Sequence, residues 1–300
     1  MTRSIRILIT GASGMLGAAL VQELSTRATC IALCRSQPEN GDVIWAPVDL
    51  LAEQHVSSTL ERYSPEVIVH AAALTNVDTC ERESGMAFAL HVEATRTLAA
   101  YCCGRGAKLI YVSTDAVFDG KKLESYLEDD IPNPLQAYGR SKLAGEGVAL
   151  VSPRALVLRT NIFGWRPRRH DSFAEWVLKS LREERELTMF KDVSFTPIAT
   201  KLFAQVVARC IEMDLNGIYH AGGSEVVSKC EFAYRVASAY GLSTAPITPI
   251  RLEDRPLLAP RARNMALCSA RLSAALGVSV PGLDASIRAW RETEPDTVRT

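Results

Sequence analysis

The stretch Ile5-Arg-Ile-Leu-Ile-Thr10, followed at once by Gly11-Ala-Ser-Gly-Met-Leu-Gly17, decides the fold of this chain. Its first part is an apolar run of the kind that forms a strand buried on both faces of a sheet. The glycines of the second part allow a tight turn and a close approach of backbone N–H groups to a ligand, and a helical pattern begins at Met15. A strand, a glycine-rich turn and a helix in this order indicate a loop that binds the pyrophosphate of a dinucleotide.

Strand and helix patterns alternate through the first half of the chain. The apolar runs are residues 5–10, 29–34, 67–71, 108–113 and 154–159, and the helical patterns between them are 15–25, 51–63, 85–104 and 137–150. This alternation predicts a doubly wound α/β fold, a parallel sheet of the Rossmann type. After about residue 160, the alternation of strand and helix patterns becomes irregular. We expect a dinucleotide-binding domain over 1–165, rejoined by about 192–220, and a smaller substrate-binding lobe made of 166–191 and 221–300.

Composition and charge disfavour several classes of protein. The 300 residues are 47% hydrophobic, and 34 lysines and arginines balance 34 aspartates and glutamates. Such a chain has no net charge to attract nucleic acid or an anionic membrane, and no apolar stretch approaches the roughly 20 residues of a membrane span. Its eight cysteines and five histidines show no zinc-binding spacing. We expect a cytoplasmic protein with no metal, no nucleic-acid partner and no membrane partner.

Tyr138 and Lys142, in the run Ala137-Tyr-Gly-Arg-Ser-Lys142, are the first candidates for chemistry. Their separation of four residues places both on one face of a helix, so the ammonium can sit near the phenol. A nearby positive charge lowers the pKa of a tyrosine from its ordinary value of about 10. Beside a dinucleotide loop, the pair indicates a hydride-transfer enzyme in which Tyr138 is the acid. The alternative is a chance pair on a solvated helix.

The end of the second strand, Cys34-Arg35-Ser36, bears on the choice of cofactor. An enzyme that prefers NAD usually has a carboxylate there for the ribose 2′-hydroxyl, whereas a cation suits the 2′-phosphate of NADP. Arg35 is followed by no carboxylate before Glu39. NADP is therefore the predicted cofactor and NAD the alternative, unless Arg35 is an ordinary surface arginine. Asp49 would lie near the adenine if residues 46–50 form the third strand.

Further motifs follow in order along the chain: Asp49-Leu50, Ala71-Ala-Ala73, Ser113-Thr-Asp115 and Pro132–Glu146. With the glycine loop and the tyrosine–lysine pair, they make the chain resemble the extended short-chain dehydrogenase/reductases. Within these it is most similar to the dTDP-4-dehydrorhamnose reductase family. The resemblance covers the first 165 residues well and the remainder loosely.

The resemblance implies a triad of Thr114, Tyr138 and Lys142. Thr114 would hold the substrate carbonyl, Tyr138 would protonate its oxygen as NADPH delivers hydride, and Lys142 would lower the pKa of the phenol and bind the nicotinamide ribose. The implied NADP-binding residues are Gly11, Ser13, Gly14, Met15, Leu16, Arg35, Asp49, Leu50, Ala71, Ala72, Ala73, Ser113, Tyr138 and Lys142. The implied substrate-binding residues are Asp115, Asn161 and Arg261.

Several positions leave alternatives open. Asp115 is followed by Ala116 where related dehydratases have glutamate, which disfavours dehydration. Asp115 either polarises the substrate or only holds its loop, and Ser113 either contacts the cofactor or only ends a strand. His91 stands where the family often has asparagine. It can make similar hydrogen bonds, change a proton relay or simply pack.

Two clusters of arginines are candidates for holding a diphosphate, with solvated arginines as the alternative. They are Arg166, Arg168 and Arg169, and further along the chain Arg261 and Arg263. The segment Asp192-Val-Ser-Phe-Thr-Pro-Ile198 departs from the Gly-Ala-Pro-Thr or Gly-Ser-Pro-Thr pattern that is common at the substrate lobe of these reductases. The sequence therefore does not fix which sugar is bound.

The resemblance implies an NADPH-dependent reductase of a 4-keto-6-deoxy sugar nucleotide, which serves polysaccharide or glycoside synthesis. One alternative is a non-catalytic NADP-binding subunit, because the regulatory β subunit of methionine adenosyltransferase is similar in its loop and its Tyr-x-x-x-Lys run. Another is a nucleotide-sugar epimerase, which would hold NAD firmly and which Arg35 disfavours. A homodimer is left open.

Overall fold

The computed structural model describes residues 5–39, 43–167, 171–255 and 259–296. Within these residues, seven parallel strands form a central sheet in the order β11-β6-β5-β4-β1-β2-β3. The strands are β1 (Arg6–Thr10), β2 (Thr29–Leu33), β3 (Ile44–Ala46), β4 (Val67–His70), β5 (Lys108–Thr114), β6 (Ala155–Thr160) and β11 (Gly217–His220). The strand order reverses between β1 and β4, so the predicted doubly wound α/β fold is confirmed.

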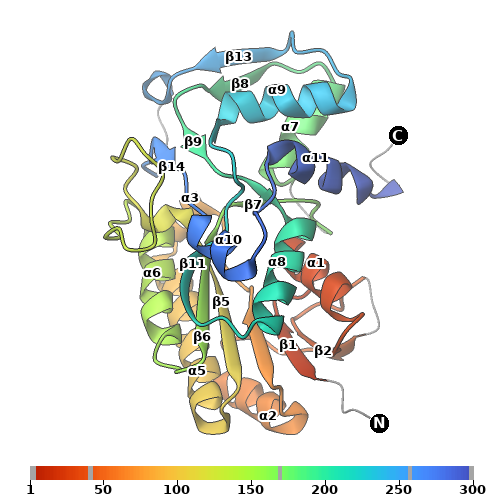
Figure 1. The fold of residues 1–300 in the computed structure, drawn as a ribbon, viewed down its shortest axis with the longest axis vertical. Helices are drawn as coiled ribbons and strands as arrows, with labels where there is room; N and C mark the ends of the chain where they lie inside the picture. The colour runs from red at the N-terminus through yellow and green to blue at the C-terminus, as the bar shows by residue number, and fades with distance from the viewer. Residues whose placement is uncertain (1–4, 40–42, 168–170, 256–258, 297–300) are drawn as a thin grey trace.

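Helices cover both faces of this sheet (Figure 1). On one face lie α1 (Met15–Leu24), α8 (Thr200–Glu212) and α10 (Ala270–Leu276), and on the other lie α2 (Glu53–Tyr63), α5 (Ala94–Arg105) and α6 (Ala137–Ala149). Successive residues of β1 point to opposite faces. Ile7 and Ile9 pack in the core with α1 and α8, whereas Leu8 packs in the core with α2 and α5. A strand between two cores needs apolar residues on both sides, which explains its unbroken apolar run.

A smaller lobe lies beyond the carboxyl ends of the strands (Figure 1). Its helices are α7 (Phe173–Arg182), α9 (Lys229–Tyr240) and α11 (Leu283–Glu292). Its short strands pair as β8 (Leu187–Phe190) with β13 (Ile247–Ile250), and as β9 (Ser194–Phe195) with β12 (Val227–Ser228) and β14 (Asn264–Met265). A separate core that includes Phe163, Phe195, Phe232 and Trp290 holds the lobe together.

The chain passes between the two parts more than once. β7 (Ile162–Phe163) pairs with β10 (Ile198–Ala199), and α8 and β11 then return to the sheet, where β11 pairs with β6. Leu272 and Leu276 of α10 also pack in the core of the sheet. The residue boundaries of the two predicted domains stay a prediction.

The helix expected over residues 85–104 is interrupted. It consists of α4 (Ser84–Phe88), a π-helical turn η1 (Ala89–Glu93) and α5, with α3 (Val77–Arg82) just before it. Two 3₁₀ turns, η2 (Asp115–Val117) and η3 (Leu252–Asp254), lie further along the chain. The π turn contains His91, whose ring makes contacts at the site described below, and such turns often mark functional positions.

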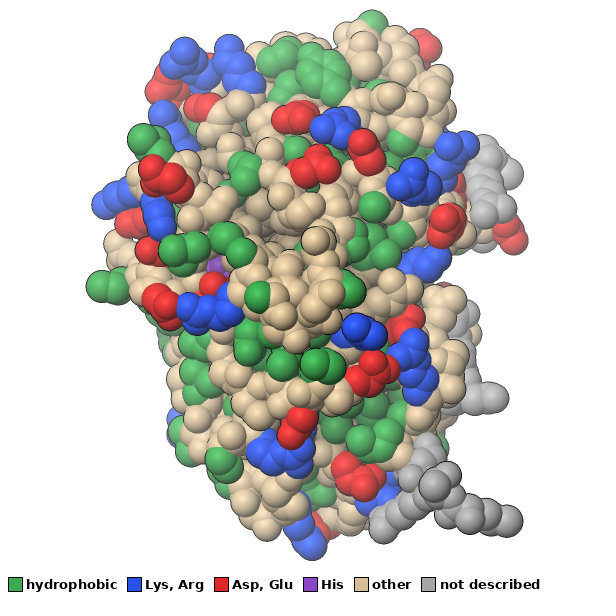
Figure 2. All heavy atoms as spheres, viewed as in Figure 1, with side chains coloured by type: hydrophobic (Ala, Val, Ile, Leu, Met, Phe, Trp, Pro, Cys, Tyr) green, Lys and Arg blue, Asp and Glu red, His purple; other side chains and the backbone are tan. Residues whose placement is uncertain are grey.

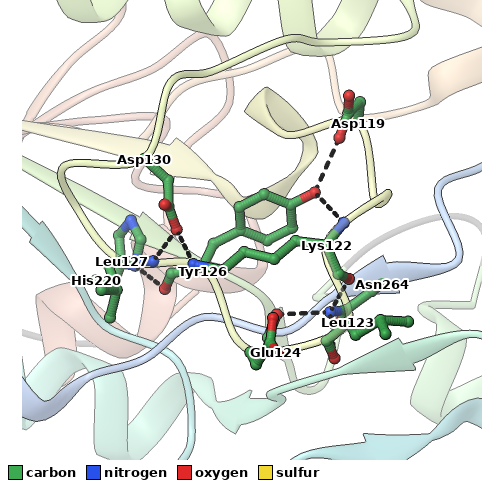
Figure 3. A network of polar contacts seen from close by, with 9 residues as sticks. All are labelled: Asp119, Lys122, Leu123, Glu124, Tyr126, Leu127, Asp130, His220 and Asn264. Carbon is green, nitrogen blue, oxygen red and sulfur yellow. Dashed lines mark hydrogen bonds and ion pairs between the residues drawn. The ribbon is translucent and has the colours of Figure 1, made fainter.

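The connection from η2 to α6, residues 118–136, is held by polar contacts (Figure 3). Tyr126 donates a hydrogen bond from its hydroxyl to Asp119 at 2.9 Å, and Lys122 forms an ion pair with Asp130 at 2.6 Å. From β14, the Asn264 side-chain amide donates to three carbonyl groups, those of Lys122, Leu123 and Glu124. This loop joins Thr114 to Tyr138 in the chain, and its hydrogen bonds and ion pair restrict how the two residues move relative to each other.

The surface shown in Figure 2 carries acidic and basic side chains interspersed over the whole face. No patch of a single sign dominates that face, in keeping with the balanced composition. Among the helices that the structure describes, none is long and apolar enough to cross a membrane.

Candidate active site

A cavity of about 1100 Å³ lies between the carboxyl edge of the sheet and the smaller lobe. The predicted triad, the predicted NADP-binding residues and the predicted substrate-binding residues Asp115, Asn161 and Arg261 all line it. Of the predicted arginine clusters, Arg166 and Arg261 line the cavity, whereas Arg263 is exposed and forms an ion pair with Glu253. Arg168 and Arg169 lie outside the described residues. Ligand sites of doubly wound folds form at this edge, because the connections leave a crevice where the strand order reverses.

One end of the cavity is the turn between β1 and α1. Gly11 has φ +66°, and a Cβ on it would lie 2.8 Å from the Cα of Ala72, so only glycine fits here. Gly14 caps the N-terminus of α1 and provides no side-chain acceptor for its first N–H groups. Free N–H groups and the positive end of the helix dipole then face the cavity, which suits a pyrophosphate.

Arg35 and Asp49 lie farther along the same wall. Arg35 follows β2 and is exposed, and no hydrogen bond or ion pair in the described part of the chain includes its guanidinium. Among the described residues this guanidinium is unpaired, so it is available to bind a phosphate. Asp49 lies three residues beyond the end of β3 and accepts a hydrogen bond from the N–H of Leu51 at 3.0 Å.

Tyr138 is the second residue of α6, and the packing of that helix brings it to the end of β5. A Cβ on Gly139 would lie 2.1 Å from the carbonyl oxygen of Ala116, so the helix rests directly on η2. The carboxylate of Glu81 accepts a hydrogen bond from the first N–H of the helix, at Ala137, at 2.6 Å. An anion at the N-terminus stabilises a helix, and here it also fixes the position of Tyr138.

Thr114 ends β5 and contacts both neighbours in the site. Its hydroxyl donates a hydrogen bond to Asp115 Oδ1 at 3.0 Å and accepts one from the N–H of Ala116 at 3.1 Å. Thr114 also lies near the phenol of Tyr138, and its hydroxyl opposes the rise in the pKa of that phenol that burial causes. The structure therefore brings together the two residues predicted to flank the substrate carbonyl.

Lys142 lies one turn after Tyr138, as its spacing predicts, but its ammonium contacts another ring. Nζ lies 3.9 Å from the ring centroid of Tyr111. Burial lowers the pKa of Lys142 to about 7, and the carboxylate of Glu146 opposes that shift. The pKa of Tyr138 is raised well above its ordinary value by burial, and the opposing contribution comes from Thr114. The predicted lowering of this pKa by Lys142 is therefore not found in this structure.

Behind the triad, Glu146 joins β5 to β6. It accepts a hydrogen bond from the Ser113 hydroxyl and forms an ion pair with Arg159 at 2.7 Å. Ser113 thus lines the cavity while its hydroxyl bonds the protein interior, and its contact with the cofactor stays a prediction. The spacing of four residues between Lys142 and Glu146 is a signal that sequence reasoning did not use.

His91 is buried beneath this wall of the cavity. Its Nε2 accepts a hydrogen bond from the N–H of Leu74 at 3.0 Å, and its Nδ1 lies 2.8 Å from the Ser141 hydroxyl. Burial lowers the pKa of His91 to about 2, so the ring is neutral, and Nδ1 carries the proton because Nε2 accepts. The histidine therefore makes hydrogen bonds that position the segment after β4 and the catalytic helix.

Comparison with known proteins identifies the family. The sequence model of the RmlD substrate binding domain matches residues 5–295. The chain belongs to this family. It is 31% identical to a probable low-salt glycan biosynthesis reductase, Agl14, of Haloferax volcanii, over 94% of this chain and 95% of that one. It is 33% identical to methionine adenosyltransferase 2 subunit beta of Bos taurus, over 96% of this chain and 90% of that one.

The fold matches that of a solved dTDP-4-dehydrorhamnose reductase. The crystal structure of dTDP-4-dehydrorhamnose reductase from Bacillus anthracis, in complex with NADP, superposes with a TM-score of 0.88 at 25% identity. The match covers 98% of this chain and all of that one. This RmlD family member therefore shares both lobes with that enzyme.

The substrate side of the cavity centres on Asp115, whose side chain is only 3% exposed. Asp115 accepts hydrogen bonds from Thr114 and from the side-chain amide of Asn161. Burial raises its pKa, and these bonds and the charge of Lys229 oppose the rise. Arg261, farther out, forms an ion pair with Asp78 at 3.2 Å. Asp115 therefore both holds its turn and faces the cavity.

Sequence reasoning missed Lys229, the first residue of α9, which also lines the cavity. Its ammonium lies 3.2 Å from the ring centroid of Phe195 and 4.6 Å from that of Phe173. Burial lowers its pKa to about 7, and Asp115 opposes this shift. No local pattern could reveal this lysine, because its aromatic neighbours come from distant parts of the chain.

Proposed function

We propose that this protein is an NADPH-dependent reductase of the 4-keto group of a 4-keto-6-deoxy sugar nucleotide, of the dTDP-4-dehydrorhamnose reductase type. The observation that carries the proposal is that Thr114, Tyr138 and Lys142 line the same cavity as the glycine loop. A reductase name on one relative, and NADP in a related dTDP-4-dehydrorhamnose reductase of the same fold, support it.

The residues that line the cavity fit a dinucleotide. The uncapped start of α1 would receive the pyrophosphate, Arg35 the 2′-phosphate, and Ala71, Ala72 and Ala73 the flat rings, since small side chains leave room there. Bound NADPH supplies the hydride that the reduction requires. NAD remains the alternative cofactor.

Thr114 and Tyr138 would each hydrogen-bond the keto oxygen. A phenol with a raised pKa keeps its proton at neutral pH, so Tyr138 is present as a donor. The donor becomes effective when negative charge develops on the oxygen that it faces. Lys142, with a pKa lowered to about 7, would hydrogen-bond the nicotinamide ribose and provide a nearby cation for the phenolate that forms.

The diphosphate of the sugar nucleotide would lie along the outer wall of the cavity. Arg166, Arg255 and Arg261 line that wall, and guanidinium groups suit phosphate oxygens. We also propose that the protein acts in the cytoplasm, since all eight of its cysteines are free thiols, as is usual in a reducing compartment. A homodimer stays a prediction.

A direct assay tests the function. Purified protein with NADPH and dTDP-4-keto-6-deoxyglucose or its C3/C5 epimer should consume the reduced nicotinamide. Tyr138→Phe should lower kcat by about 10²–10⁴-fold while NADPH binding stays within about twofold. Tyr101→Phe is the matched control, because Tyr101 is a partly buried tyrosine whose hydroxyl bonds the Pro65 carbonyl and does not line the cavity. Full activity of Tyr138→Phe would remove this residue from the mechanism.

A regulatory subunit is the second candidate, and the 33% identity to the bovine subunit beta favours it. On this reading the cavity binds NADP without turnover. Inactivity on every keto-sugar nucleotide, together with tight binding to a methionine adenosyltransferase, would establish the regulatory role instead of the reductase.

A further inference from the structure

Lys229 lines the cavity, and its ammonium forms no hydrogen bond with the described residues. In the described part of the chain, no hydrogen bond or ion pair includes its Nζ, although an ammonium carries three donors. Two phenyl rings hold it by cation–π contacts, from Phe195 at 3.2 Å and Phe173 at 4.6 Å. Lys229 is half-buried and lines the cavity, so its ammonium can form a hydrogen bond with a ligand that supplies an oxygen.

The backbone fixes where this ammonium lies. The N–H of Lys229 donates to the carbonyl of Val193 at 3.0 Å, which ties the start of α9 beside β9. The helix begins at a Ser228 cap whose hydroxyl accepts a hydrogen bond from the N–H of Glu231 at 2.9 Å. A side chain that leaves a capped helix start and is packed between two rings has few conformations open to it. The site is therefore preformed.

The charge of the Asp115 carboxylate opposes the fall in the pKa of Lys229 that burial causes. Both side chains line the cavity, and within the described residues no ion pair of 4.0 Å or less joins them. Both oxygens of Asp115 already accept one hydrogen bond, from Thr114 and Asn161, and each retains a second lone pair. A donor and an acceptor thus both line the cavity, and the charge of each acts on the other.

We propose that Lys229 and Asp115 form a subsite for a hydroxyl group on the sugar carbon next to the reacting carbonyl. The ammonium donates a hydrogen bond to the hydroxyl oxygen, and Asp115 accepts one from the hydroxyl hydrogen. Asp115 follows Thr114 directly, and Thr114 and Tyr138 line the same cavity, so an oxygen held by these two residues would place the neighbouring carbon near Asp115. The proposal rests on the proposed function, because it assumes that a sugar carbonyl lies there.

The chemistry favours a neutral hydroxyl over an anion. The carboxylate of Asp115 would repel a phosphate or a sugar carboxylate at this point, whereas three arginines offer a phosphate a better place along the outer wall. A site that donates to and accepts from the same hydroxyl also disfavours a sugar that lacks it, since both groups then lose a hydrogen-bond partner. Lys229 would therefore help to determine specificity.

The test compares binding of a dTDP-6-deoxyhexose with its 3-deoxy analogue, in the presence of NADPH. Both the cofactor and the sugar are then in their reduced forms, so calorimetry measures affinity without turnover. We expect Lys229→Met to weaken binding of the hydroxylated sugar by about 10–100-fold and to leave the 3-deoxy analogue within about twofold. Lys229→Gln is the second variant if the first folds poorly. Lys191→Met is the control, since Lys191 is an exposed lysine of the same lobe that does not line the cavity.

Each outcome decides between readings. If Lys229→Met weakens binding of both sugars equally, Lys229 is a structural residue of the lobe and the subsite is overturned. Unchanged binding of both sugars would also overturn the subsite. Selective loss of affinity without turnover of any keto sugar by the wild type would support the subsite and overturn the reductase. If the wild type reduces a keto sugar but Lys229→Met does not discriminate between the two sugars, the reductase is supported and the subsite is overturned. Wild-type binding of either sugar nucleotide no tighter than dTDP alone would overturn the subsite.

Discussion

Glu146 and Arg159 form a buried ion pair, with 2.7 Å between their charged groups and only 3% of each side chain exposed. The same carboxylate accepts a hydrogen bond from Ser113 and lies one helical turn after Lys142. It is also the charge that opposes the fall in the pKa of Lys142. One side chain behind the cavity therefore supports both the sheet edge that bears Thr114 and the charge of the lysine in the triad.

Glu146→Gln should move the activity profile toward lower pH. Without the carboxylate, the pKa of Lys142 falls further below its value of about 7, so the ammonium is lost at lower pH. We expect the high-pH limb of kcat/KM to shift by about one unit, which is about tenfold in activity at pH 8. Unfolding in urea should show a loss of about 3–5 kcal/mol, because Arg159 is left without its partner. Glu93→Gln, at an exposed position, should change neither the pH profile nor the free energy of unfolding. If the high-pH limb of kcat/KM does not shift in Glu146→Gln, Glu146 does not control the charge of Lys142.

Gly139→Ala should damage the site through the packing of α6. The new methyl group would lie 2.1 Å from the Ala116 carbonyl, so the helix start, and Tyr138 with it, must shift. A displacement of this kind lowers kcat by about 100-fold. Gly147→Ala, in the same helix and with nothing within 4 Å of its added methyl, should retain activity and add about 0.5–1 kcal/mol of stability. Equal kcat values for the two variants would show that the contact does not position the tyrosine.

Arg35→Glu should change the cofactor preference. A charged hydrogen bond is worth about 1.5–3 kcal/mol, so loss of the guanidinium should weaken NADPH binding by about 10–150-fold. NADH has no 2′-phosphate, and its affinity should stay the same or rise. Fluorescence titration of both reduced cofactors measures the ratio, with Arg288→Glu on the surface of α11 as the control. An unchanged NADPH affinity would mean that Arg35 does not contact the phosphate.

His91→Asn should make the protein less sensitive to acid. The pKa of His91 is lowered to about 2 in the folded protein from an ordinary value of 6.5, so the unfolded chain takes up a proton first as the pH falls. The stability contribution is complete above pH 6.5 and is lost progressively below it. Between pH 6.5 and 4.5 this amounts to about 2 kcal/mol, which should disappear from the pH dependence of urea unfolding in the variant. Replacement of the exposed His55 by Asn should leave the dependence unchanged. The hypothesis fails if both variants keep the wild-type slope.

Much of the fold follows from local sequence. Apolar runs of four to six residues and the helical patterns between them predict the parallel sheet, and the turn at Gly11 marks where a dinucleotide would lie. The break in the expected helix over 85–104 was not predictable, because the π turn is stabilised by contacts of His91 with Leu74 and Ser141 from other elements.

The sequence by itself determined the sheet, the order of its connections and the residues that gather at its carboxyl edge. These follow from periodicity and short motifs, which act within a few residues of the chain. Only the tertiary structure decided the electrostatics of the site: that the ammonium of Lys142 faces Tyr111, that Glu146 is its counter-charge, and that Lys229 lies between Phe173 and Phe195 near Asp115. A pKa depends on burial and on charges brought from distant segments, and neither is encoded in any local pattern.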